Sequence, residues 1–115
     1  MKKSSETFWR ALDKLVRESE VVIDRPRGAR HPSSGDIIYP VDYGYLKGTT
    51  SMDRQGIDVW RGSLAGCSID AIVCTADLRK RDSEIKILIG CTDTEKKLIL
   101  AFCNHGDMSG MLVER

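Results

Sequence analysis

The sequence predicts an α+β fold that is mainly β and forms a single domain over residues 1–115. Helical spacing of apolar residues occurs only near the two ends of the chain, whereas short β-rich runs bounded by turn residues fill the middle. At 115 residues the chain is long enough to bury a core without disulfides or a structural metal. The order of a helix, about five strands and a second helix favours a small barrel or curled sheet, with the helices packed outside it.

The first predicted helix covers about residues 4–18. Ser4 and Ser5 can cap its start, and charged residues occupy its solvent side. The apolar face is predicted from helical spacing and consists of Phe8, Leu12, Leu15 and Val16. Trp9 lies just off this face, and packing is its expected role.

The predicted strands are runs of apolar and β-branched residues separated by polar or glycine-containing turns. They cover residues 21–23, 37–39 with 43–46, 56–60, 67–77 and 84–90. The charged turn between the last two makes them a hairpin. The tail at residues 111–113 can add a last short strand.

The second helix is predicted from about residue 93 to residue 104. Thr92 and Glu95 have the spacing of a capping box, in which two side chains satisfy backbone N–H groups at the helix start. Gly106 is expected to end the helix. Its packing face is predicted to consist of Leu98, Ile99, Phe102 and Cys103.

Composition argues against several classes of protein. The formal net charge is +1 and aromatic residues make up 6% of the chain, so neither electrostatics nor base stacking favours a nucleic-acid partner. The apolar runs are too short for a membrane-spanning helix, and no apolar core of a signal peptide follows the basic start. We therefore expect a cytoplasmic protein without nucleic-acid or membrane partners. The 4 cysteines lack CxxC spacing and the 2 histidines are isolated from them, so no zinc site is expected.

Acidic residues at two places in the predicted sheet are candidates for metal binding. Asp58 interrupts an otherwise apolar strand, and a carboxylate there needs a partner to offset its desolvation. Asp53 lies in the turn before it, and Mg²⁺ binds through a few carboxylates and water. Asp82, Glu84 and Lys86 alternate along the hairpin, so they face one side and supply two more candidate ligands and an ammonium group.

Two further features are suited to binding phosphate. The hydroxyls of Tyr39 and Tyr43 can donate to phosphate oxygens, and the loop at residues 25–32 carries three arginines with few acids nearby. A simpler explanation stays open for each feature. The tyrosines can be packing residues, the basic loop can be solvated, the acidic turn can be only a turn, and the hairpin acids and lysine can lie on the solvent-exposed side of a sheet. Their combination in one small fold favours phosphoryl transfer, which uses carboxylate-bound metals and cationic groups.

The stretch from residue 39 to residue 59 carries a resemblance to a known family. It contains Tyr-Pro-Val-Asp-Tyr-Gly-Tyr, then Thr49, then Asp-Arg-Gln-Gly-Ile-Asp-Val. This resembles the soluble family I inorganic pyrophosphatases, which carry YPxxYGY followed by DxDxxD. Asp24-Arg25-Pro26 is similar to the acid before a proline in that family, and the hairpin acids and lysine are similar to its downstream motif. The resemblance covers about residues 21–89.

This resemblance implies a fold and a mechanism. The fold would be a five-stranded barrel like the oligonucleotide-binding fold, in a homo-oligomer, with Mg²⁺ ions and pyrophosphate at its rim; Mn²⁺ is an alternative ion. Asp53 and Asp58 would be metal ligands, and Asp82 or Glu84 would complete the set of metal ligands. Asp58 would also be catalytic. Lys86 and either Arg27 or Arg30 would bind phosphate, and Tyr39 and Tyr43 would line the site.

The sequence also departs from that family. Gln55 stands where the middle acid of DxDxxD helps to activate water, and an amide cannot accept a proton at neutral pH. The segment between Asp24 and Tyr39 is too short for the family's full set of phosphate-binding residues. We therefore expect a Mg²⁺-dependent pyrophosphatase-like phosphohydrolase that is weak or altered in substrate. The alternative is a catalytically degraded module that binds a phosphate-bearing ligand or a protein.

Overall fold

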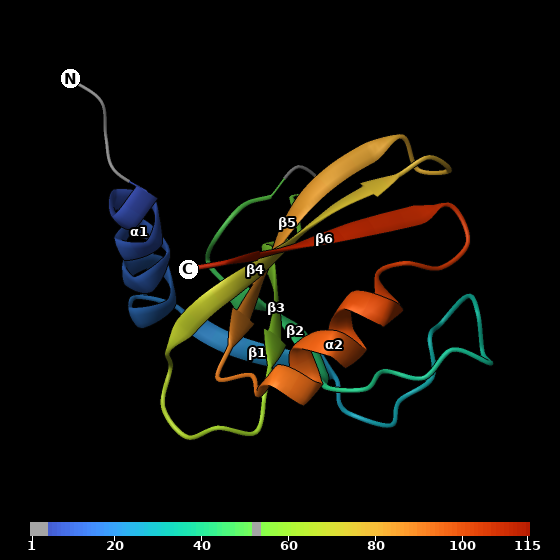
Figure 1. The fold of residues 1–115 in the computed structure, drawn as a ribbon, viewed down its shortest axis with the longest axis horizontal. Helices are drawn as coiled ribbons and strands as arrows, with labels where there is room; N and C mark the ends of the chain where they lie inside the picture. The colour runs from blue at the N-terminus through green and yellow to red at the C-terminus, as the bar shows by residue number, and fades with distance from the viewer. Residues whose placement is uncertain (1–4, 52–53) are drawn as a thin grey trace.

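A mixed β-sheet with a helix on each face forms the body of the protein in the computed structural model, which describes residues 5–51 and 54–115 (Figure 1). In chain order the elements are α1 (Ser5–Arg17), β1 (Glu20–Arg25), β2 (Asp42–Lys47), β3 (Ile57–Arg61), β4 (Ile69–Asp77), β5 (Asp82–Ile89), α2 (Asp93–Phe102) and β6 (Met108–Glu114). The predicted α+β, mainly β class is confirmed.

The sheet is open and has six strands in the order β1-β2-β3-β5-β4-β6. Neighbouring strands are antiparallel except β3 and β5, which are parallel. The predicted five-stranded barrel is therefore wrong in strand number and in closure, because a closed barrel requires the two outer strands to pair with each other. The additional strand is the tail, which pairs with β4 from Met108 to Glu114 rather than over three residues.

Apolar side chains fill both faces of the sheet, because neighbouring residues of a strand point to opposite sides. Val59 and Ile87 pack with Trp9 of α1, whereas the adjacent Trp60 and Leu88 pack with Ile99 of α2. The sheet is thus the middle layer between two helices, one on each face.

Helix α1 buries a different face from the predicted one. Trp9, Leu12 and Val16 are buried, at three- and four-residue spacing, while Phe8 is 42% exposed and Leu15 39% exposed. The indole of Trp9 also lies under the guanidinium of Arg115, with 5.9 Å from the guanidinium carbon to the ring centroid. Burying the largest apolar side chain rotates the helix by about one residue from the predicted orientation.

The predicted hairpin and the predicted start of the second helix are confirmed. Strands β4 and β5 pair from Asp77 and Asp82 at the turn to Ile69 and Ile89 at the other end. In α2, the Glu95 N–H donates to the Thr92 hydroxyl while the Glu95 carboxylate accepts from the Thr92 N–H, which is the capping box. The helix ends at Phe102, earlier than the predicted residue 104.

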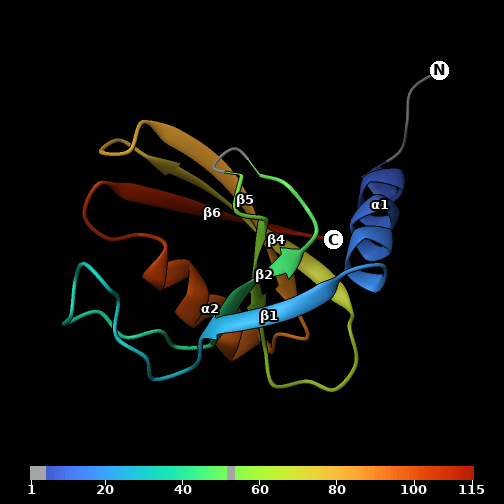
Figure 2. The same ribbon diagram turned by 180° about the vertical axis from the view of Figure 1, so that it is seen from behind.

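Residues 37–39 do not form a sheet strand, contrary to the prediction. Instead they turn back on the preceding loop: Tyr39 N–H donates to Ala29, and Gly28 N–H donates to Tyr39, each at 2.9 Å. Figure 2 shows this loop after β1 extending past the end of the sheet. Pairing within the loop leaves Tyr39 only 2% exposed.

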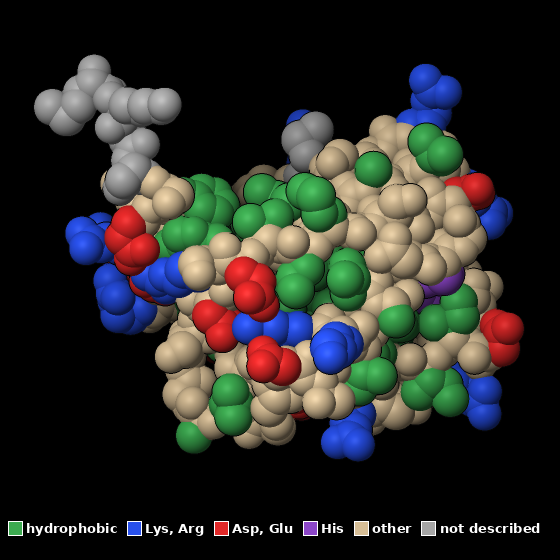
Figure 3. Space-filling view, viewed as in Figure 1, with side chains coloured by type: hydrophobic (Ala, Val, Ile, Leu, Met, Phe, Trp, Pro, Cys, Tyr) green, Lys and Arg blue, Asp and Glu red, His purple; other side chains and the backbone are tan. Residues whose placement is uncertain are grey.

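One face of the protein carries charged side chains of both signs (Figure 3). Figure 3 shows acidic and basic side chains interspersed with apolar ones over one face, without a large area of one sign. Among the described residues, no helix is long and apolar enough to cross a membrane.

Candidate functional site

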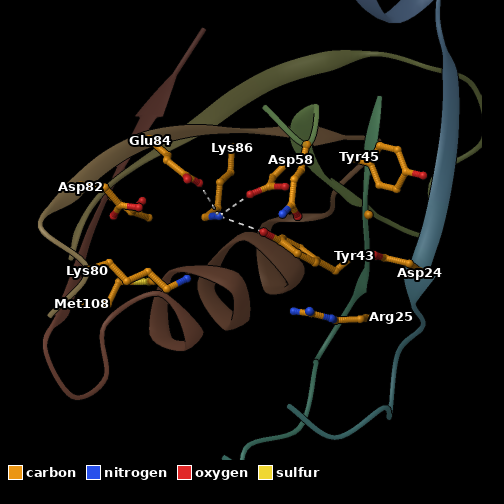
Figure 4. A pocket seen from close by; sticks show the side chains of 13 residues that line it. Asp24, Arg25, Tyr43, Tyr45, Asp58, Lys80, Asp82, Glu84, Lys86 and Met108 are labelled. Carbon is orange, nitrogen blue, oxygen red and sulfur yellow. Dashed lines mark hydrogen bonds and ion pairs between the residues drawn. The ribbon is translucent and has the colours of Figure 1, made fainter. Parts of the chain in front are cut away.

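One polar pocket of about 360 Å³ collects most of the candidate site residues (Figure 4). This volume is at the lower end of the range for small-molecule sites. Its walls come from the end of β1, from β2, from β3 and the turn before it, from the β4–β5 hairpin and from the start of β6. The lining residues are Asp24, Arg25, Tyr43, Gly44, Tyr45, Gln55, Asp58, Thr75, Lys80, Asp82, Glu84, Lys86 and Met108.

Gly44 explains why the Tyr-Gly-Tyr motif builds one wall of this pocket. A Cβ at this position would collide with the carbonyl oxygen of Val22 in β1, so only glycine allows the two strands to approach this closely. The register of β1 on β2 shifts between Ile23 and Arg25, which marks a bulge at the position between them. A bulge re-aims nearby side chains, and here Asp24 and Arg25 both line the pocket.

Lys86 is the electrostatic centre of the pocket. Its Nζ donates to Tyr43 Oη at 2.8 Å, to Asp58 Oδ2 at 2.8 Å and to Glu84 Oε2 at 3.4 Å. The residue is 7% exposed, so these contacts offset the cost of removing a charge from water. Burial acts to lower the pKa of Lys86, but the neighbouring Tyr43 and Asp58 outweigh it and raise the pKa. Lys86 is therefore a cation at every physiological pH.

Tyr43 stays protonated beside this cation. Burial raises the pKa of its hydroxyl, the positive charge of Lys86 acts in the opposite direction, and the negative charge of Asp58 raises the pKa further. The ring also packs against Trp60, with 4.6 Å between ring centroids. Tyr43 accepts from Lys86 and keeps its own proton, for which the neighbouring Asp58 carboxylate is already an acceptor.

The hairpin residues Asp82, Glu84 and Lys86 all line the polar pocket, as their alternate spacing predicts. Figure 4 shows Glu84 and Asp58 pointing toward the Lys86 amino group from different strands. The partner that Asp58 requires in its apolar strand is therefore Lys86, at 2.8 Å.

The described carboxylates of the pocket do not form a metal-binding cluster by themselves, and the Mg²⁺ ion stays a prediction from the sequence. Among residues 5–51 and 54–115, no three acidic, histidine or cysteine side chains are arranged to hold one ion. Asp58 and Glu84 already share the Lys86 ammonium group, and Asp82 lines the same pocket. Mg²⁺ needs only one or two carboxylates when phosphate oxygens and water supply its other ligands. The predicted ligand Asp53 lies outside the described residues.

The remaining predicted residues have different positions relative to the pocket. Gln55 lines it, at the turn before β3. Tyr39 lies behind the lining, where its hydroxyl accepts from Arg25 Nη1 at 2.6 Å. Arg27 and Arg30 are exposed and are not among the lining residues; Arg30 Nη1 donates to the Gly35 carbonyl at 2.7 Å.

Arg25 and Lys80 also line the pocket. The sequence indicated Arg25 only as one of the three arginines of the basic loop at residues 25–32, and it did not indicate Lys80. Arg25 lies between Asp24 and Pro26, inside a motif already noted for its acid, so its position was a usable signal. Lys80 lies between two arginines in the hairpin turn, and nothing in the sequence distinguishes it from them.

A scan against models of known protein families finds no match, and a search of curated proteins finds no similar sequence either. The resemblance to the inorganic pyrophosphatases therefore rests on the motif residues themselves.

Proposed function

We propose that the protein is a Mg²⁺-dependent phosphohydrolase of the pyrophosphatase type, acting on pyrophosphate or a related phosphoanhydride in the cytoplasm. The observation that carries this proposal is the convergence of Tyr43, Gln55, Asp58, Asp82, Glu84 and Lys86 in one pocket. These residues were selected from sequence motifs on three separate strands and a turn. Their convergence supports a common site, and we propose that this site retains the local architecture of the pyrophosphatase fold despite the open sheet.

The proposed chemistry follows from the charges in the pocket. Lys86 and the protonated Tyr43 bind phosphate oxygens, with Lys86 held in place by Asp58 and Glu84. A Mg²⁺ or Mn²⁺ ion held by Asp58 and Asp82 or Glu84 would neutralise phosphate charge and activate water for attack. Gln55 can orient that water but cannot accept its proton, so turnover is expected to be slow.

Phosphate release from pyrophosphate, ADP and ATP, with Mg²⁺ or Mn²⁺, tests the proposal. Asp58→Asn keeps the size of the side chain and removes its charge, and we expect it to lower kcat/KM by about a hundredfold or more. Asp36→Asn, in an exposed loop away from the pocket, is the matched control. The proposal fails if none of these substrates is hydrolysed, or if Asp58→Asn and Asp36→Asn have equal activity.

One observation favours a second candidate, a module that binds a phosphate-bearing ligand or a protein without catalysis. The Lys86 ammonium group already pairs with Asp58 and Glu84, so both carboxylates have a cationic partner without a metal. Such a module needs no general base, so a glutamine at position 55, where the base is expected, is compatible with it.

The variant Gln55→Asp separates the two candidates. A phosphohydrolase that lacks only its base should gain about tenfold or more in kcat when a carboxylate is restored. A binding module should gain no activity, and calorimetry should detect pyrophosphate binding that is the same with and without Mg²⁺. Circular dichroism of the variant checks that the fold is retained.

A further inference from the structure

The polar pocket contains two cations that have no carboxylate partner in the part of the chain the structure describes. The Arg25 guanidinium donates to the neutral hydroxyl of Tyr39 at 2.6 Å and lies over its ring, with 5.6 Å from the guanidinium carbon to the centroid. The Lys80 ammonium group takes part in no ion pair with residues 5–51 or 54–115. Lys86, by contrast, is already paired with two acids.

These two cations come from opposite sides of the pocket. Arg25 ends β1, and Lys80 lies in the turn between β4 and β5. Figure 4 shows both side chains pointing into the half of the pocket away from Glu84 and Asp58. The pocket is therefore divided into a half where Asp58 and Glu84 pair with Lys86 and a half that holds Arg25 and Lys80, with Asp24 and Asp82 also in the lining.

The surroundings of Arg25 and Lys80 support this division. His31 stacks on Tyr39 with 6.0 Å between ring centroids and 4° between ring planes. Its pKa is lowered, first by burial and then by the positive charges of Arg25, His105 and Lys80. An anion bound between Arg25 and Lys80 would relieve the mutual repulsion of these groups.

We propose that Arg25 and Lys80 form the anion-binding half of the pocket and hold the terminal phosphate of a diphosphate ligand, with Tyr39 as the residue that positions Arg25. A guanidinium group matches two phosphate oxygens at once, while an ammonium group acts as a point charge. The nature of the ligand, a phosphoanhydride, rests on the proposed function. The anion-binding role of Arg25 and Lys80 does not require hydrolysis.

Titration calorimetry with pyrophosphate in the presence of EDTA tests this role on the full chain. Arg25→Gln and Lys80→Gln should each raise Kd by about tenfold to a hundredfold, as expected for loss of a charge-assisted contact. Arg79→Gln is the matched control, because Arg79 is next to Lys80 in the same turn but does not line the pocket. Its Kd should stay within about twofold of the wild type. If Arg25→Gln and Lys80→Gln bind pyrophosphate like the control, or if the wild type does not bind it, the proposal is wrong.

The positioning role of Tyr39 has its own readout. Tyr39→Phe keeps the ring and removes the hydroxyl that holds Arg25, so it should raise Kd in the wild-type background. In the Arg25→Gln background the same change should have no further effect, because the group it positions is absent. Additive effects of the two substitutions would contradict the positioning role.

Two further measurements separate the possible outcomes. Orthophosphate and ADP, titrated beside pyrophosphate, distinguish a free diphosphate from the diphosphate of a nucleotide. Steady-state hydrolysis separates this inference from the proposed function. If phosphate is released but KM is unchanged in Arg25→Gln and Lys80→Gln, the anion site is wrong while the activity stands. If no phosphate is released but pyrophosphate binding depends on both residues, the anion site stands and the activity is wrong.

Discussion

Lys86 links three strands of the sheet through its side chain. Its Nζ contacts Tyr43 from β2, Asp58 from β3 and Glu84 from β5 itself. It also lies over the Tyr43 ring, 5.3 Å from the centroid. A buried carboxylate pair without its cation is destabilising, so we expect this lysine to stabilise the fold as well as to take part in the proposed phosphate binding.

We predict that Lys86→Met lowers the free energy of unfolding by about 3 kcal/mol at neutral pH, because two partly buried carboxylates lose their partner. Urea unfolding at neutral pH measures the effect. Lys97→Met, on the exposed side of α2, is the control, and an equal loss of stability in both variants would contradict the account.

Several of the site residues could be predicted from the sequence, because their side chains are of a type that is unusual among their sequence neighbours. Asp58 is an acid in an apolar strand, and its required partner is indeed present as Lys86. Lys80 follows no such pattern, since a charged residue in a turn is ordinary, and Arg25 was indicated only as one of the three arginines of the basic loop. Only the bulge before Arg25 and the course of the hairpin turn bring them into the pocket.

At the scale of the elements, Glu95 connects the start of α2 to the loop after β3. Its carboxylate accepts from the Thr92 N–H at 2.8 Å and from the Ser63 N–H at 3.1 Å. Burial acts to raise the pKa of Glu95, but hydrogen bonds from Thr92 and Ser63 outweigh it and lower the pKa. The capping box was predictable from local spacing, whereas the contact with Ser63 depends on tertiary structure.

We predict that Glu95→Gln lowers the stability of the protein by about 1 kcal/mol at neutral pH, because glutamine can still accept from the Thr92 N–H but the negative charge at the helix start and its charge-assisted hydrogen bonds are lost. Because the pKa of Glu95 is lower in the folded state, its contribution is complete above the ordinary value of 4.5 and is lost as the pH falls through the folded pKa. Wild type and variant should therefore converge in stability in acid. Thermal unfolding from pH 3 to pH 7 measures this, with Thr94→Ala in the same turn as control; a difference that is independent of pH would contradict the assignment.

The orientation of α1 gives a second prediction at this scale. Trp9 is 5% exposed and Phe8 is 42% exposed, although helical spacing favoured Phe8 as a core residue. Trp9→Ala should cost about 3–5 kcal/mol of unfolding free energy, as expected for deletion of a buried aromatic ring, and Phe8→Ala clearly less. Equal costs in urea unfolding, or a larger cost for Phe8→Ala, would contradict the observed orientation of α1.

The arrangement of the whole molecule was the hardest part to predict. Local patterns identified both helices and the hairpin, but the strand order depends on pairings between distant segments, such as β3 with β5 and the tail with β4. The tail contains Ser109 and Gly110, which are turn-like in sequence, yet both lie within a seven-residue strand. The Asn104 side chain bonds to the Gly110 N–H at 3.0 Å and to its carbonyl at 3.1 Å, so part of this outer edge is already satisfied. The expected homo-oligomer stays a prediction.

Phosphorus-31 NMR of pyrophosphate incubated with the intact protein and Mg²⁺ is the most direct test of the central claim, because it observes substrate and product together. The account predicts slow conversion of the pyrophosphate signal to orthophosphate, absent with Asp58→Asn and faster with Gln55→Asp. A pyrophosphate signal that does not decrease with the wild type or with Gln55→Asp, at protein concentrations where both are folded, would contradict the claim that this pocket hydrolyses it.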